Sequence, residues 1–223
     1  AYRSYLQKNE ALLQQRQAIC RERLLRQYPS TPELVQKLTG GQAAEVLWNR
    51  NARAEDFTTV RLGLGRMDIS SMIRTPAVRF SIRSDELEEQ PAKLKADYQT
   101  ILQIPSLLCI GQHKLTGIIG EQARVQEVVR NIVLQLAMLH SYTDVRLIGL
   151  FREGEQELFS WLRWLPHVFS PDKSHRLLAC SEADYQAVLS YLLDVLRARD
   201  SRDALQSGEA PLPVYVVLCT DPK

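Results

Sequence analysis

The sequence has no apolar run approaching the ~20 residues that cross a bilayer, and it has no signal-peptide pattern. Cysteine is scarce, because the chain contains only Cys20, Cys109, Cys180 and Cys219, without a CxxC pair. Such scattered cysteines, mostly within apolar runs, indicate buried free thiols in a reducing compartment rather than disulfides or a zinc site. The four histidines have no metal-ligand spacing either. We therefore expect no metal ion.

Neither the charge nor the reactive residues point to nucleic acid or to catalysis. With 28 basic and 26 acidic residues the net charge is +2, which does not indicate a nucleic-acid partner. Local spacing supports no Ser/His/Asp or Cys/His arrangement, so the sequence predicts no catalytic residues. Hydrophobic residues make up 45% of the chain, which is enough for a globular core. Because the chain starts at Ala1 without an initiator methionine, we expect an excised segment of a longer protein.

One long helix is predicted for residues 2–28, which contain neither glycine nor proline. Apolar pairs recur every seven residues and form a narrow stripe along a helix roughly 40 Å long. Six basic and two acidic residues give it a net charge of +4: Arg3, Lys8, Arg16, Arg21, Arg23 and Arg26 against Glu10 and Glu22. Either a solvated surface helix or a partner-binding stalk fits this pattern. We expect residues 1–28 to be removable from a folded remainder.

Residues 29–104 are expected to form a β-rich and helical linker region. Alternating apolar and polar residues predict its strands, and turn residues separate them. The predicted elements are a helical start at 42–47, strands at 57–63 and 78–82, and a helical segment at 93–104. Pro105 then opens the next domain.

Residues 105–223 alternate between strand and helix patterns. The predicted strands are 114–119, 145–151, 176–180 and 214–219, and the predicted helices are 121–140 and 182–199. Ser181 and Asp184 resemble a capping box at the start of the second helix. Apolar strands that alternate with helices indicate an α/β domain with a mainly parallel, Rossmann-like or P-loop-NTPase-like sheet. We expect this domain to be incomplete at its C-terminus.

The turn before the first of these helices stands where a nucleotide-binding domain has its phosphate loop. That loop needs two glycines separated by four residues, then a lysine for the phosphates and a Ser/Thr hydroxyl for magnesium. Here only two residues separate Gly117 from Gly120, and Glu121 and Gln122 occupy the lysine and hydroxyl positions. A carboxylate at the first helical position satisfies the helix dipole and repels a triphosphate. The sequence therefore predicts a degenerate phosphate site without a cofactor.

Two other interpretations of this region have weaker support from the sequence: a dinucleotide-binding site and a magnesium site. The same glycines form an incomplete dinucleotide fingerprint, without an acidic residue about twenty positions later at the end of the next strand. Asp221 follows an apolar strand, as the magnesium-binding aspartate of ATPases does, but Pro222 follows where a second acid is usual. A turn-capping role for Asp221 is the commoner one.

The segment Trp161-Leu-Arg-Trp-Leu-Pro-His167 places two indoles three residues apart on a short helical turn. Tryptophan is enriched in interface hot spots, so Trp161, Trp164 and His167 are candidates for a partner surface. Packing of both rings on the edge of the core is the alternative. We expect one ring in the core and the other exposed.

Several segments, taken in order, resemble the membrane-proximal cytoplasmic part of the FtsK/SpoIIIE-type ATPases of type VII secretion, the EssC/EccC family. The resemblance covers nearly the whole chain and depends on the ordered set rather than on one motif. Its segments are Leu47-Trp-Asn-Arg50, Asp56-Phe-Thr-Thr-Val-Arg-Leu-Gly63, Gly117-Ile-Ile-Gly120, Gln135-Leu-Ala-Met-Leu-His140 and Trp161-Leu-Arg-Trp-Leu-Pro-His167.

The resemblance implies a membrane-anchored hexameric motor that exports small helical-hairpin proteins through a series of ATPase-like modules. The module nearest the membrane is degenerate in this family, in agreement with Glu121, Gln122 and Pro222. ATP and magnesium would belong to downstream modules. The implied partners are the protein's own membrane anchor, its downstream modules and other membrane subunits of the secretion system. The segment would lie on the cytoplasmic side of the bacterial cell membrane.

Overall fold

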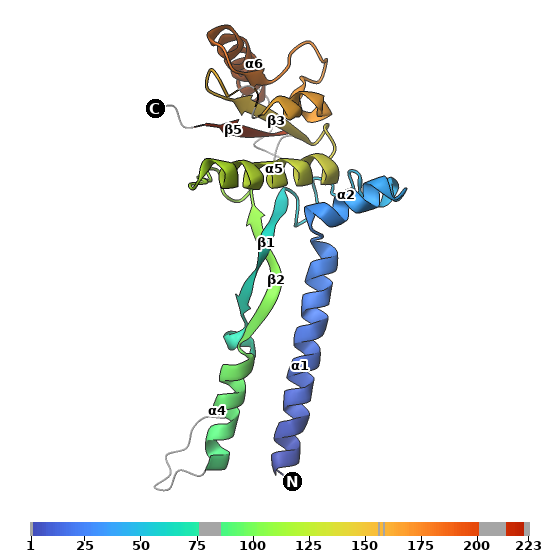
Figure 1. Ribbon diagram of the computed structural model, residues 1–223, viewed down its shortest axis with the longest axis vertical. Coiled ribbons are helices and arrows are strands. Elements are labelled where there is room, and N and C mark those ends of the chain that lie inside the picture. Colours follow the sequence, from blue (N-terminus) through green and yellow to red (C-terminus); the bar gives the residue numbers. More distant parts are fainter. Residues whose placement is uncertain (1, 76–85, 156, 158, 201–212, 221–223) are drawn as a thin grey trace. The chain divides into compact units, whose positions relative to one another are not determined.

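The computed structural model describes residues 2–75, 86–155, 157, 159–200 and 213–220, which fall into two compact units (Figure 1). The first unit consists of residues 1–33 and 59–108, and the second of residues 34–58 and 109–223. This division differs from the predicted boundaries after residues 28 and 104. Residues 34–58 group with the second unit, although the strand that follows them groups with the first.

Helix α1 (Tyr2–Gln27) confirms the long helix predicted at the N-terminus. Its Cys20 and Leu24 pack on an apolar cluster of the same unit, whose buried members are Ile69, Ile101 and Ile104. The other elements of this unit are the paired strands β1 (Thr59–Asp68) and β2 (Thr100–Cys109), η1 (Ser70–Met72) and α4 (Glu86–Tyr98).

Polar contacts also attach α1 to the rest of its unit. Gln17 Nε2 donates to the carbonyl oxygen of Tyr98 over 2.7 Å, and Arg21 Nε donates to the carbonyl oxygen of Leu102 over 3.0 Å. The Tyr98 hydroxyl donates to Glu10 Oε1 over 3.1 Å. With apolar and polar contacts on one side, α1 is an integral part of the first unit. Our expectation that it could be removed without loss is not supported by this packing.

The helical segment predicted for residues 93–104 is wrong in its second half. Helix α4 ends at Tyr98, residues 100–104 begin β2, and Pro105 lies within that strand instead of opening a domain. Proline is tolerated in a two-stranded ribbon, where each strand has a free edge. Gln103 has a left-handed backbone (φ 57°), and it interrupts the alternation that identifies a strand. The strand predicted at 57–63 is observed as β1, whereas the one predicted at 78–82 lies outside the described residues.

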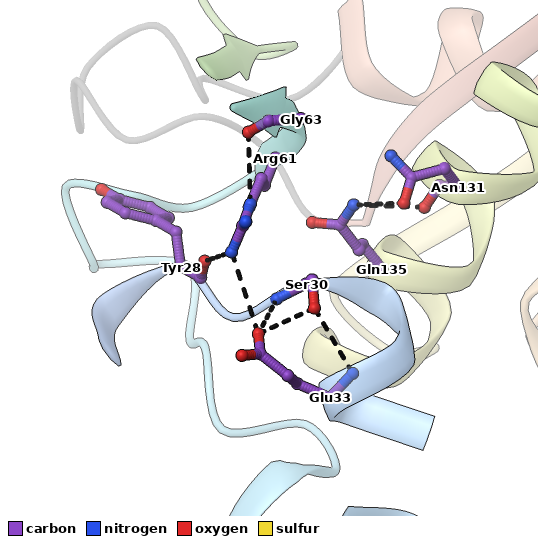
Figure 2. Close-up of polar contacts among 7 residues, drawn as sticks. All are labelled: Tyr28, Ser30, Glu33, Arg61, Gly63, Asn131 and Gln135. Atoms are coloured by element: carbon purple, nitrogen blue, oxygen red, sulfur yellow. Dashed lines mark hydrogen bonds and ion pairs between the residues drawn. The ribbon is translucent and has the colours of Figure 1, made fainter. Parts of the chain in front are cut away.

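The guanidinium of Arg61 connects three parts of the first unit (Figure 2). Its Nη1 donates to the carbonyl oxygen of Tyr28 over 3.0 Å and lies 3.8 Å from Glu33 Oε2, while its Nε donates to the carbonyl oxygen of Gly63 over 3.2 Å. Glu33 also accepts the main-chain N–H of Ser30 over 2.6 Å, as in a capping box. Arg61, which is 9% exposed, thus joins the segment after α1 to β1.

The second unit contains a three-stranded parallel sheet in the order β4-β3-β5, with α5 and α6 on opposite faces (Figure 1). This confirms a mixed α/β fold with a small parallel sheet, while the P-loop-like topology stays a proposal. Helix α2 (Thr31–Thr39) enters this unit at Leu34. The other elements are α3 (Ala43–Val46), α5 (Gln122–Leu139), β3 (Val145–Leu150), η2 (Ser160–Trp164), η3 (Pro166–Val168), β4 (Leu178–Ala179), α6 (Glu182–Asp200) and β5 (Val214–Cys219).

The two long helices of this unit begin and end within a residue or two of the predicted limits, and the capping box is confirmed. Ser181 Oγ donates to Asp184 Oδ2 over 2.7 Å, and the main-chain N–H of Asp184 donates back to Ser181 Oγ over 3.3 Å. The hydrogen bond from Ser181 lowers the pKa of Asp184 below its usual range. On α5, the side chain of Gln135 is buried and donates from Nε2 to Asn131 Oδ1 over 3.0 Å (Figure 2).

The strand predicted at Lys114–Ile119 is wrong for the described structure. This segment is irregular and pairs with no strand among the described residues. Leu115 is 93% exposed and Ile119 is 100% exposed. The sequence pattern indicates that this segment prefers an extended backbone. A strand also needs a neighbouring strand with free hydrogen-bonding groups.

Candidate functional site

A cavity of about 610 Å³ lies at the position of the predicted phosphate site. The first turns of α5 supply one wall, and the carboxyl ends of β3 and β5 supply another. Ligands of open parallel sheets bind at this edge, so the cavity is a candidate ligand site. Its lining includes Gly120, Gln122, Val125, Phe151, Arg152 and Thr220.

The charges in this cavity do not suit a triphosphate. Arg152 and Glu155 are the charged residues among the described lining residues, and their charges cancel. The main-chain N–H of Arg152 donates to Thr220 Oγ1 over 3.2 Å, so this hydroxyl at the end of β5 already has a donor. Asp221, the candidate magnesium ligand, lies outside the described residues.

The two glycines do not form a tight anion cradle in the described structure. A Cβ on Gly117 would meet nothing within 4 Å, and a Cβ on Gly120 would lie 3.7 Å from the side chain of Val125. Neither glycine has the left-handed backbone that L-residues avoid. Glu121 is the N-cap of α5 without a side-chain capping hydrogen bond, so Gln122, not Glu121, is the first helical residue.

An aromatic wall separates this cavity from a second one of about 520 Å³. The rings of Phe151 and Phe159 stack with their centroids 4.0 Å apart, and both line both cavities. A Cβ on Gly149 would collide with the Phe151 ring, so only glycine at this position leaves room for the stack.

The proposed partner-surface residues have different environments. Trp164 is 81% exposed, whereas Trp161 is half-buried beneath the guanidinium of Arg130, whose Cζ lies 5.8 Å from the ring centroid. His167 is buried, at 1% exposed, and is therefore not part of an exposed surface. The turn that carries all three residues is η2 followed by η3, as the proline-broken pattern predicts.

A second group of polar residues, centred on His140 at the end of α5, is buried in the core of the second unit. His140 Nε2 accepts the main-chain N–H of Thr58 over 3.1 Å, and its Nδ1 lies 3.2 Å from the carbonyl oxygen of Leu136. These two contacts assign the proton to Nδ1, because Nε2 must be an acceptor. His167 Nε2 in turn lies 2.9 Å from the carbonyl oxygen of His140.

Aromatic rings surround this pair of histidines. The ring of Phe57 lies edge-on to His140 at 5.2 Å, and Tyr142 lies edge-on to His167 at 6.4 Å. Burial lowers the pKa of His140 to about 4 and also lowers the pKa of His167. Both imidazoles are therefore neutral at pH 7, and no reactive group of this cluster is open to solvent.

Residues 47–58 satisfy the carbonyl groups at the C-terminal end of α5. The main-chain N–H groups of Trp48 and Arg50 donate to the carbonyl oxygens of Met138 and Leu139 over 2.9 and 3.0 Å. Arg50 Nε lies 3.5 Å from Asp56 Oδ2, and the Arg50 side chain is 8% exposed. A helix end needs such donors, and here a distant segment supplies them.

The described residues contain no group of three or more His, Cys, Asp or Glu side chains arranged to hold a metal ion. Among the helices of the described residues, none has the length and apolarity of a bilayer-spanning segment.

No protein-family model matches this chain. Over 221 residues, 99% of this chain, it is 28% identical to the ESX secretion system protein EccC of Geobacillus thermodenitrificans. It is also 24% identical over 79% of its length to the ESX secretion system protein YukB of Bacillus subtilis, and 25% identical over 87% to the type VII secretion system protein EssC of Staphylococcus aureus.

The chain is thus similar, over 79–99% of its length, to a segment of type VII secretion proteins of the EssC/EccC kind. It spans only 12–15% of the length of these relatives. Four of the segments that carry the EssC/EccC resemblance meet at the histidine pair: 47–50, the first residues of 56–63, 135–140 and 161–167. Sequence reasoning missed this convergence, because no spacing links residues so far apart in the chain.

Proposed function

We propose that this EssC/EccC segment is a non-catalytic structural and regulatory module of a membrane-anchored type VII secretion motor. The observation that carries the proposal is the charge of the 610 Å³ cavity: one arginine is balanced by one glutamate, without a lysine among the described lining residues. Phosphoryl-transfer sites depend on positive charge to hold the triphosphate and to stabilise its transfer. A neutral cavity of largely apolar lining supplies neither.

The rest of the second unit supports a structural role. Its polar cluster is buried and neutral, and its hydrogen bonds connect residues 47–58 to α5 and η3. Such a network rigidifies a core and offers no group for acid-base chemistry. We propose that this rigid unit couples the membrane part of a longer polypeptide to downstream ATPase modules.

We also propose where this segment acts. It lies on the cytoplasmic side of the cell membrane, in a hexameric motor that contacts other membrane subunits of the secretion system. ATP and magnesium would act in the downstream modules. The names of the relatives, which refer to ESX or type VII secretion, support a role in this secretion system. The partners are proposed from the family resemblance.

Isothermal titration of Mg-ATP into the chain tests the proposal. We expect no heat of binding, whereas a Kd tighter than about 100 μM, roughly −5.5 kcal/mol, would refute it. Glu121→Lys is the control variant, because it places a positive charge at the residue that occupies the lysine position of the predicted phosphate loop. We expect this variant not to bind either, because the shortened glycine turn still lacks the donors of a phosphate loop.

The alternative function is a nucleotide-binding or hydrolysing module with a divergent loop. One observation favours it: the cavity has the size and the position of a nucleotide site. Binding of Mg-ATP that is lost on substitution of Arg152 by methionine would establish this alternative.

A further inference from the structure

The 520 Å³ cavity, which the stacked phenylalanine rings separate from the larger one, has no part in the proposed function. It lies at the carboxyl ends of β3 and β4, beside the start of α6, and all of its described lining belongs to the second unit. Ligand pockets usually have volumes of about 300–1,000 Å³, apolar walls and a few convergent polar groups. The cavity is therefore a candidate binding site in its own right.

Two arginines give this cavity its positive charge. Arg163 of η2 and Arg176, just before β4, both line it, and neither forms an ion pair with a described residue. Arg163 Nε donates to the carbonyl oxygen of Ser160 over 2.8 Å, and the Cζ of Arg176 lies 5.2 Å from the centroid of the Phe169 ring. These contacts position the guanidinium groups but neutralise neither, so both are available to bind a carboxylate through paired hydrogen bonds.

The acidic residue of the described lining, Asp184, does not balance both arginines. Its Oδ2 accepts the hydroxyl of Ser181 over 2.7 Å and the main-chain N–H of Ser181 over 3.2 Å. With histidine counted as neutral, two arginines and one aspartate give the described lining a net charge of +1. One carboxylate balances this charge, whereas a phosphate monoester, with a charge of about −1.5 to −2, would leave excess negative charge beside Asp184.

The rest of the cavity suits a peptide rather than a small anion. Phe151, Phe159 and Leu178 supply an apolar wall, which an apolar side chain next to the bound carboxylate would cover. Trp164 follows Arg163 at the end of η2 and is 81% exposed. Tryptophan and arginine are enriched among the hot spots of protein interfaces. The cavity and this exposed ring together indicate a docking site for a protein segment.

We propose that the 520 Å³ cavity binds a short linear segment of a partner protein, in which a glutamate or aspartate has a leucine or phenylalanine as its neighbour. The carboxylate pairs with the guanidinium groups of Arg163 and Arg176. The apolar side chain packs on the stacked rings of Phe151 and Phe159. This binding does not depend on whether the 610 Å³ cavity takes up Mg-ATP.

A random peptide library displayed on phage tests this proposal when it is panned against the immobilised 1–223 chain without nucleotide. We expect the enriched sequences to share an acidic residue beside a leucine or phenylalanine. The most enriched peptide, synthesised with a fluorescein label, should bind with a Kd of about 100 μM or tighter, measured by fluorescence anisotropy. Replacement of its carboxylate by the matching amide should weaken binding by roughly tenfold.

Arginine variants locate the bound carboxylate. Arg163→Gln and Arg176→Gln should each weaken binding of the labelled peptide by roughly tenfold. Arg124→Gln is the matched control, because Arg124 is an exposed arginine on α5 outside the described lining of this cavity. This control should bind the peptide like the wild type. All three arginines are exposed, so we expect the melting temperatures to stay close to that of the wild type.

A cavity-filling variant tests the apolar part of the site without removing a charge. Ala187 lines the cavity on α6 and is exposed, so the indole of Ala187→Trp should occupy the space of the peptide and abolish binding. Ala183→Trp places the same ring at an exposed position of α6 outside the described lining. We expect Ala183→Trp to bind the peptide with unchanged affinity.

Three outcomes would overturn the proposal. A library without enriched sequences, or with enriched sequences that lack an acidic residue, would show that the arginines recruit no acidic segment. Displacement of the labelled peptide by inorganic phosphate as effective as by unlabelled peptide would identify a general anion site. Unchanged binding in Arg163→Gln, Arg176→Gln and Ala187→Trp would place the peptide on another surface.

Discussion

The main-chain N–H of Thr58 donates a hydrogen bond to Nε2 of His140 across 82 positions of sequence, over 3.1 Å. This bond requires a neutral imidazole, because a protonated Nε2 has no lone pair to accept it. Burial enforces the same state by lowering the pKa of His140 to about 4. The contact therefore makes the second unit sensitive to acid.

We expect the free energy of unfolding to fall as the pH drops from about 6.5 to about 4. The folded state keeps His140 neutral in this range, while the unfolded chain takes up a proton near the usual pKa of 6.5. Above pH 6.5 both states are neutral, so this histidine adds no pH dependence there. The loss attributable to His140 is about 3 kcal/mol across the window.

Urea unfolding of the wild type and of His140→Gln at pH 7 and pH 4.5 measures this effect. Glutamine retains an acceptor for the Thr58 N–H but does not titrate. The variant should lose less stability than the wild type between the two pH values, with His167 contributing to what remains. An equal loss in both proteins would assign the acid sensitivity to other groups.

Substitution of Arg61 by methionine should destabilise the first unit by about 1–3 kcal/mol, because it leaves the carbonyl groups of Tyr28 and Gly63 without this donor. Arg66→Met is the matched control, since Arg66 lies on the same strand but is exposed. Its effect should stay within about 0.5 kcal/mol. Similar losses in both variants, measured by thermal melting, would contradict a specific role of the Arg61 contacts.

Trp161 and Trp164 should contribute unequally to the free energy of unfolding. Trp164→Ala should change the free energy of unfolding by no more than about 0.5 kcal/mol, because the ring is 81% exposed. Trp161→Ala should cost about 2 kcal/mol, because it removes a half-buried ring and its contact with Arg130. Iodide should quench Trp164 fluorescence more strongly than that of Trp161. Equal stability losses would mean that both rings are structural.

Deletion of residues 1–28 should disrupt the first unit, because the apolar cluster of Ile69, Ile101 and Ile104 loses the cover of α1. A finer test replaces Leu24, which packs on this cluster, with aspartate. The unfolding free energy should fall by about 2 kcal/mol, while the exposed Ile19→Asp should have little effect. If the truncated chain melts with unchanged cooperativity, α1 is a separable stalk after all.

The sequence alone determined the elements whose evidence is local. The apolar periodicity of residues 122–139 and 182–200 predicted both long helices, and Ser181 with Asp184 predicted the cap that the structure shows. The degenerate phosphate site inferred from Gly117, Gly120, Glu121 and Gln122 also depends on a local pattern, and it stays a prediction. Helical periodicity and capping depend on residues within one or two helical turns. Sequence patterns can therefore predict both features.

Only the tertiary structure decided which segments find partners. Lys114–Ile119 has a strand pattern but no described strand beside it, and Pro105 lies within β2 because the apolar cluster selects extended backbone there. The contacts of His140 with Thr58 and His167 depend on segments that are distant in the chain. Hydrogen bonds and packing contacts between such distant segments form only when the chain folds. No local sequence pattern therefore predicts these contacts.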